Sequence, residues 1–259
     1  MRRLLIAAAI VALCLPIAGA AAQRQIVQSG NVRVSFGGRL APRALPREHP
    51  APVTVHLDGS VATVDGSRPP QLREIAVAIN RAGRVSTVGL PTCPPSRLQQ
   101  TSTEAALDLC RGALVGHGRF AVNVDVSDSS LIPAKGAVLV FNSSTRKGPG
   151  MVLHLYGTTP VKAAFILPFE ISHQPRGEFG TVFSAKIPTL ASDLGYVTDI
   201  ELTIGRRYRY AGKSRSFLSA SCAAPAGFPG AVYQLAEATF TFPEGKRLTS
   251  KLPGDCKVR

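Results

Sequence analysis

Histidines and strand-borne acids are the side chains in this sequence best suited to acid–base or nucleophilic chemistry. The histidines are His49, His56, His117, His154 and His173, and the acids on expected strands are Asp125, Glu170, Asp199 and Glu201. A histidine beside Ser219 or Ser221 would suit hydrolysis through an activated hydroxyl, and two acids at a suitable separation would suit glycoside cleavage. No spacing brings these groups together, so each is more simply interpreted as a solvated or hydrogen-bonded side chain.

The motifs that mark common catalytic and cofactor sites are absent from the sequence. There is no Gly-x-Ser-x-Gly elbow, no His-Glu-x-x-His motif, no phosphate-binding loop and no Gly-x-Gly-x-x-Gly fingerprint. There is also no Cys-x-x-Cys pair and no histidine pair at metal-ligand spacing, so we expect no metal and no cofactor. A non-enzymatic protein is the favoured class, with a secreted hydrolase of unrecognised active site as the alternative.

The run Arg206-Arg207-Tyr208-Arg209-Tyr210 interleaves guanidinium groups with aromatic rings. Such a pattern suits phosphate binding and ring stacking. It also suits an edge strand whose charges prevent aggregation. We therefore take Arg206, Arg207 and Arg209 as candidate anion-binding residues.

The first 22 residues have the pattern of a cleavable signal peptide. Met1-Arg2-Arg3 precedes an apolar run from Leu4 to about Leu15, and small residues follow up to Ala22. The run is short for a membrane span of about 20 residues, and no later segment has 18 consecutive apolar residues. We expect cleavage after Ala20 or Ala22 and a secreted or envelope-associated product.

The chain is basic, with a formal charge of +14 that becomes +12 once Arg2 and Arg3 are removed. Most of this charge belongs to residues 23–50 and 200–259. A positive field attracts anionic partners. For an exported protein we expect anionic cell-wall polymers or lipid head groups, rather than a specific nucleic acid.

Four cysteines remain after cleavage, and an even number in an exported chain favours disulfides. Three pairings are possible. Loop closure favours near neighbours, which predicts Cys93–Cys110 and Cys222–Cys256.

Many short alternating segments separated by Gly and Pro predict an all-β fold, which we expect to be an antiparallel β-sandwich with one short α-helix. The helix should begin at the capping box Thr101–Glu104 and extend to about Leu114. We expect a flexible N-terminus over 23–30, an irregular segment over 37–52 and a hairpin turn at Asp58-Gly59. Residues 31–259 should form a single domain.

Several phrases of the sequence occur together in a known group. They are Leu90-Pro91-Thr92-Cys93, Cys110-Arg111-Gly112-Ala113-Leu114, Leu167-Pro168-Phe169 and Ser219-Ala220-Ser221-Cys222. With them the chain resembles a group of uncharacterised exported proteins from high-GC Gram-positive bacteria. The resemblance implies an extracellular setting and no particular activity.

These observations predict an exported, disulfide-stabilised binding or structural protein. They indicate neither its ligand nor its oligomeric state.

Overall fold

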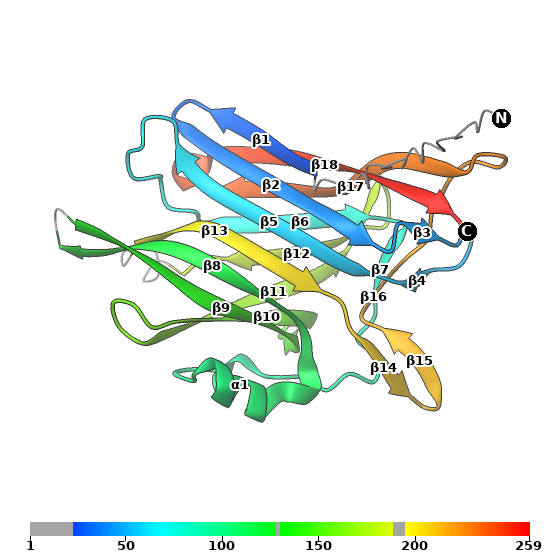
Figure 1. Cartoon of the computed structure of the whole chain (residues 1–259), viewed down its shortest axis with the longest axis horizontal. Helices are drawn as coiled ribbons and strands as arrows, with labels where there is room; N and C mark the ends of the chain where they lie inside the picture. Colours follow the sequence, from blue (N-terminus) through cyan, green and yellow to red (C-terminus); the bar gives the residue numbers. More distant parts are fainter. Residues whose placement is uncertain (1–22, 128–129, 189–194) are drawn as a thin grey trace, which may run out of the picture.

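The computed structural model describes residues 23–127, 130–188 and 195–259, so the expected signal peptide over 1–22 lies outside the described residues. Strands dominate the described chain, and one short α-helix accompanies them (Figure 1). The expected all-β class with a single short helix is confirmed. Within the described ranges, no helix is long and apolar enough to cross a membrane.

Within the described residues, thirteen strands form one continuous curled sheet rather than two separate ones, so the two-sheet sandwich is not confirmed. Neighbouring strands are antiparallel, except that β18 and β3 are parallel. The order across the sheet is β1 (Gln23–Ser29), β2 (Val32–Ala41), β5 (Thr54–Thr63), β13 (Gly195–Ile204), β8 (Leu114–Ser127), β9 (Ser130–Thr145), β10 (Gly148–Gly157), β11 (Ala163–His173), β12 (Phe179–Lys186), β6 (Glu74–Asn80), β17 (Gly230–Thr241), β18 (Arg247–Val258) and β3 (Ala44–Leu45).

The curl brings the two margins of the sheet together, so that β1 and β2 lie against β18 (Figure 1). Side chains of β2, β17 and β18 form one buried cluster there, including Val34, Phe240 and Leu252. At Gly38 an added Cβ would lie 3.2 Å from the Leu252 side chain. The margins therefore meet through packed side chains, and the sheet acquires an inside and an outside.

Smaller elements close one end of the curled sheet. A three-stranded sheet contains β4 (Ala51–Pro52), β16 (Leu218–Ala220) and β7 (Gly83–Val85), and a separate hairpin contains β14 (Arg207–Tyr210) and β15 (Lys213–Ser216). We call this end, where the C-terminus also lies in Figure 1, the closed end. The opposite end, with the β5–β6, β8–β9 and β10–β11 connections, is the open end.

The helix α1 (Thr103–Cys110) lies on the outer face of β9 and β10, and is shorter than expected. Ser102, not Thr101, is its N-cap and accepts a hydrogen bond from Ala105 N at 3.3 Å. After it the chain forms the 3-10 turn Arg111–Ala113 and enters β8; two other 3-10 turns are Pro95–Arg97 and Pro243–Gly245.

Both expected disulfides are present. Cys93–Cys110 joins the loop before the first 3-10 turn to α1, and Cys222–Cys256 joins the segment after β16 to β18. Their Cα separations of 5.7 and 5.6 Å are ordinary for disulfides.

Three local expectations were wrong. The N-terminus over 23–30 is not a loose segment, because Gln23–Ser29 pairs with β2 along its whole length. This pairing uses backbone groups, so it does not require apolar side chains. The segment 37–52 is only partly irregular, since β2 continues to Ala41. Gly37 and Gly38 permit this, because a Cβ at Gly37 would come within 2.6 Å of Asp58 Oδ1.

Asp58-Gly59 is not a turn but the middle of β5, paired with β2 on one side and β13 on the other. Arg24 explains why an aspartate is tolerated there, since its guanidinium forms an ion pair with Asp58 at 2.7 Å. The pairing of two neighbouring strands outweighs the local turn preference of the dipeptide.

Candidate functional site

The curled sheet encloses an apolar cavity of about 710 Å³. Its wall consists mainly of inward-facing aliphatic and aromatic side chains from distant parts of the chain. They include Leu57, Val77, Val122, Leu167, Ile200 and Leu202. The volume lies within the range of about 300–1,000 Å³ that is usual for small-molecule sites.

The cavity exists because the inward side chains do not fill the space that the curled sheet encloses. One buried cluster belongs mostly to β8–β12 and the closed end, and another to β2, β17 and β18. Between them, inward aliphatic side chains such as Val55, Leu57 and Ile200 are only partly buried. Protein interiors are normally packed as densely as organic crystals, so this accessible apolar surface is unusual for a core.

Glycine contributes to the free space at the centre of the wall. Gly59 faces inward on β5 between Phe36 of β2 and Ile200 of β13. A Cβ added there would have no neighbour nearer than 3.6 Å. The position could therefore carry a side chain, which would project into the cavity.

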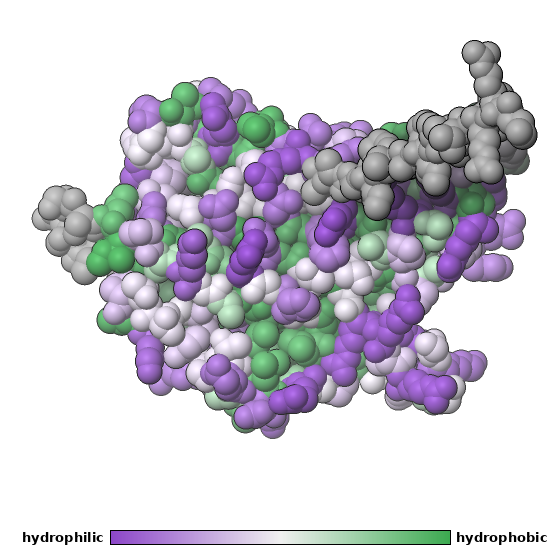
Figure 2. Space-filling model, viewed as in Figure 1, coloured by the Kyte–Doolittle hydropathy of each residue, from purple (hydrophilic) through white to green (hydrophobic). Residues whose placement is uncertain are grey.

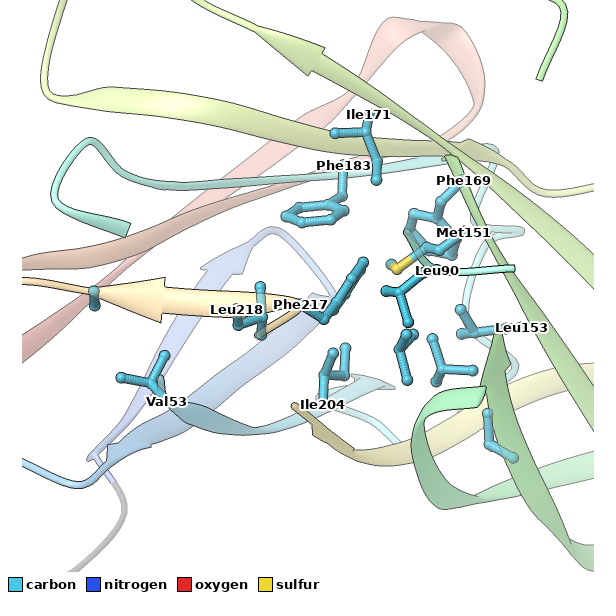
Figure 3. Packing of buried hydrophobic residues seen from close by; sticks show 14 of the residues in the cluster. Val53, Leu90, Met151, Leu153, Phe169, Ile171, Phe183, Ile204, Phe217 and Leu218 are labelled. Atoms are coloured by element: carbon cyan, nitrogen blue, oxygen red, sulfur yellow. The ribbon is translucent and has the colours of Figure 1, made fainter. Parts of the chain in front are cut away.

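The closed end is sealed by packed side chains (Figure 3). Phe217 is fully buried and points toward Phe169 and Phe183 on one side and Ile204 on the other. Backbone hydrogen bonds hold it in place, since Ser86 N donates to Phe217 O and Phe217 N donates to Arg206 O, at 2.9 and 2.8 Å. These packed side chains narrow the closed end, where the exposed Arg84 of β7 also lines the cavity.

The open end connects the cavity to solvent. Val161 and Val197 both line the cavity, yet their exposed fractions are 68% and 43%. Phe165, another lining residue, is also exposed, and so are Val64 and Leu131 at the ends of neighbouring strands. We call these five residues the apolar rim.

Polar side chains at the cavity have protein partners or lie near its ends. Asn80 donates to Gln234 O and accepts from Ala82 N, both at 2.9 Å. Burial, and to a smaller degree the nearby Asp255 charge, raises the pKa of Tyr233, which keeps its hydroxyl neutral. The wall therefore offers van der Waals contact and few free hydrogen bonds.

The histidines and hydroxyls considered for hydrolysis do not meet in this cavity. Ser219 lines it, but none of the five histidines does. His56 and His117 flank Thr203 on neighbouring strands, with His56 Nδ1 and Thr203 Oγ1 3.0 Å apart. Burial, then the Arg39 and His117 charges, lower the pKa of His56.

Asp199 and Glu201 share the exposed face of β13, whereas Asp125 and Glu170 lie on other strands, and three of the four acids form ion pairs. Asp125 pairs with Arg68, Glu170 with Lys147 and Glu201 with Arg119, at 2.6, 3.0 and 2.8 Å. Glu201 correspondingly raises the pKa of Arg119. Within the described ranges, no group of three or more His, Cys, Asp or Glu side chains could hold a metal ion.

The three candidate anion-binding arginines differ in their surroundings. Arg206 donates to the carbonyl oxygens of Arg111, Gly112 and Leu114, at 3.2, 2.7 and 2.7 Å, and so ties β14 to the end of the helical segment. Arg207 and Arg209 are exposed on the β14–β15 hairpin. Only the latter two present free guanidinium groups to solvent.

Sequence reasoning missed the cavity. The available signal was the alternation of Val, Leu, Ile and Phe on the strands, which by itself predicts only an inner face. Comparisons with protein-family models, with curated proteins and with solved structures gave no match for this chain.

Proposed function

We propose that this is an exported, non-enzymatic binding protein that holds an apolar ligand in the cavity of its curled sheet. The observation that carries the proposal is the partly accessible, almost wholly apolar wall, sealed at one end and open at the other. Leaving such a wall in contact with water costs about 25 cal/mol per Å² of exposed apolar surface. A hydrocarbon ligand would remove that cost.

The ligand class follows from the wall. A methylene group occupies about as much space as a water molecule in the liquid, about 30 Å³. The cavity therefore has room for roughly 24 such groups, which suits one long or two shorter hydrocarbon chains. A polar group on the ligand would remain at the open end, because the wall provides few hydrogen-bonding partners.

Export is part of the same proposal and rests on the signal-peptide pattern of residues 1–22. Two disulfides are typical of proteins that fold in oxidising compartments. The secreted hydrolase is the weaker alternative, because the histidine–hydroxyl pair His56–Thr203 lies away from the cavity.

A cavity-filling substitution tests the proposal. Gly59→Phe should place a ring inside the cavity without a backbone clash, whereas Ala62→Phe is a matched control on an exposed position of the same strand. The wild-type protein and the control should saturate with a fluorescent fatty acid and should release lipid on organic extraction. Gly59→Phe should lose at least about nine-tenths of the bound probe while unfolding at an unchanged or higher temperature.

Equal probe binding by Gly59→Phe and the wild-type protein would place the ligand elsewhere. Absence of both probe binding and extractable lipid in the wild-type protein would overturn the proposed function.

A further inference from the structure

The apolar rim gathers exposed hydrophobic side chains around the mouth of the cavity. Its members lie at the ends of β5, β13, β9 and β11 or in the β10–β11 connection, which are near neighbours in the sheet order. Figure 2 shows hydrophobic surface beside the end of the β8–β9 hairpin, at the left of the view. Val161, Phe165 and Val197 also line the cavity, so apolar side chains of the rim extend into its wall.

The charges around the rim favour an anionic surface. Lys162 follows Val161 directly, and Lys186 lies at the end of β12; both are exposed and form no ion pair with any residue the structure describes. Glu74 lies opposite Lys186 on β6, and two other acids at this end have partners. Asp65 accepts from Ser67 N at 2.9 Å, and Asp125 pairs with Arg68 at 2.6 Å.

We propose that the open end docks on a lipid bilayer containing anionic lipid, with the apolar rim inserted among the lipids and the lysines at the head groups. Exposed valine, leucine and phenylalanine beside lysine are the composition that binds membrane interfaces. A hydrocarbon chain then passes between the bilayer and the cavity without crossing water. This inference rests on the proposed function, because it gives the cavity its source of ligand.

The experiment measures co-sedimentation with vesicles of phosphatidylcholine and phosphatidylglycerol. Val161→Glu puts a charge on the rim, and Val232→Glu is a matched control because Val232 is 81% exposed on β17, outside the rim. We expect the apparent affinity to fall at least about tenfold for Val161→Glu and to stay unchanged for Val232→Glu. Vesicles of phosphatidylcholine alone should bind more weakly.

Separate readouts keep the two proposals apart. Val64→Glu, which charges a rim residue outside the cavity lining, should also weaken docking but should still bind the fluorescent fatty acid added from solution, and Gly59→Phe should still dock on vesicles. Failure of probe binding with intact docking would therefore remove the proposed function alone.

Three results would overturn the docking proposal. One is no vesicle binding by the wild-type protein. Another is binding lost on Arg207→Glu/Arg209→Glu but retained on Val161→Glu, which would assign the contact to the closed end. The third is self-association that Val161→Glu dissolves, without vesicle binding, since the rim would then be an interface between copies of this chain.

Discussion

His154 is the most deeply buried titratable side chain on the outer side of the sheet. It is fully inaccessible beneath the segment before α1, and its Nε2 lies 3.0 Å from Thr101 O, which accepts the ring proton. Its Nδ1 has no partner among the described residues. Burial is the main cause that lowers the pKa of His154 below 6.5, so the ring is neutral in the folded protein.

The protein should therefore lose stability as the pH falls below about 6.5. There the unfolded chain binds a proton at His154 that the folded chain excludes, so the free energy of unfolding decreases until the folded pKa is reached. Urea titrations at pH 7.5 and 5.0 measure the loss. Asp65, with a pKa of about 2, and Glu104, whose pKa is lowered from 4.5, titrate mainly below this window.

His154→Leu should reduce the pH dependence, because it removes the buried proton acceptor. His56 contributes in the same direction, since its pKa is also lowered. His56→Gln serves as the comparison and should leave the contribution of His154 in place. A pH dependence unchanged in His154→Leu would contradict the assignment.

Among the elements, the segment between β16 and β17 depends on a covalent tie. Cys222 is fully buried, and its disulfide to Cys256 holds the segment against β18, across a sequence separation of 34 residues. The strands β16 and β4, which belong to the seal of the closed end, share only a two-residue register.

Removing this disulfide should destabilise the protein by about 3–4 kcal/mol on the chain-entropy model. The double variant Cys222→Ser/Cys256→Ser, compared with the wild-type protein by urea unfolding, measures the loss. The matched variant Cys93→Ser/Cys110→Ser removes a bond that spans a shorter separation of 17 residues, so its free energy of unfolding should fall slightly less. Two variants as stable as the wild-type protein would show that the unfolded chain is not constrained by these bonds.

Local sequence signals predicted what is local in this fold. The alternation of Val53, just before β5, with Val55 and Leu57 identified the inward face of that strand, and near-neighbour loop closure predicted both disulfides. The dipeptide Asp58-Gly59 misled, because its conformation depends on β2 and β13, which the chain supplies far from it. The cavity was out of reach for the same reason, since an unfilled volume depends on how side chains from many strands fit together.

As a whole, the molecule has two unlike ends. The connections at the closed end, residues 42–53, 81–92, 146–147, 174–178 and 205–229, contain twelve lysine or arginine residues and two acids. The described connections at the open end contain four lysine or arginine residues and two acids. These connections are residues 64–73, 158–162, 187–188 and 242–246. Figure 2 shows the hydrophilic surface of the β14–β15 hairpin. The positive charge therefore lies mainly opposite the apolar rim.

This separation leads to a prediction about anionic cell-wall polymers, the partners expected from the basic composition. The closed end should bind them weakly, through exposed cations such as Arg207 and Arg209, while the open end remains free. Co-sedimentation with isolated Gram-positive cell walls should decrease as the Debye length falls from about 10 Å at 0.1 M salt to about 3 Å at 1 M.

The charge reversal Arg207→Glu/Arg209→Glu should weaken wall retention several-fold, because it replaces two exposed cations by anions on one hairpin. Arg206 is left unchanged in this variant, since its guanidinium holds three carbonyl oxygens and its loss would disturb the fold. Val161→Glu should be retained as well as the wild-type protein, because the rim lies at the other end. Wall retention that changes neither with salt nor in the double reversal would mean that the basic end does not contact the polymer. Loss of wall retention in Val161→Glu would assign the contact to the open end.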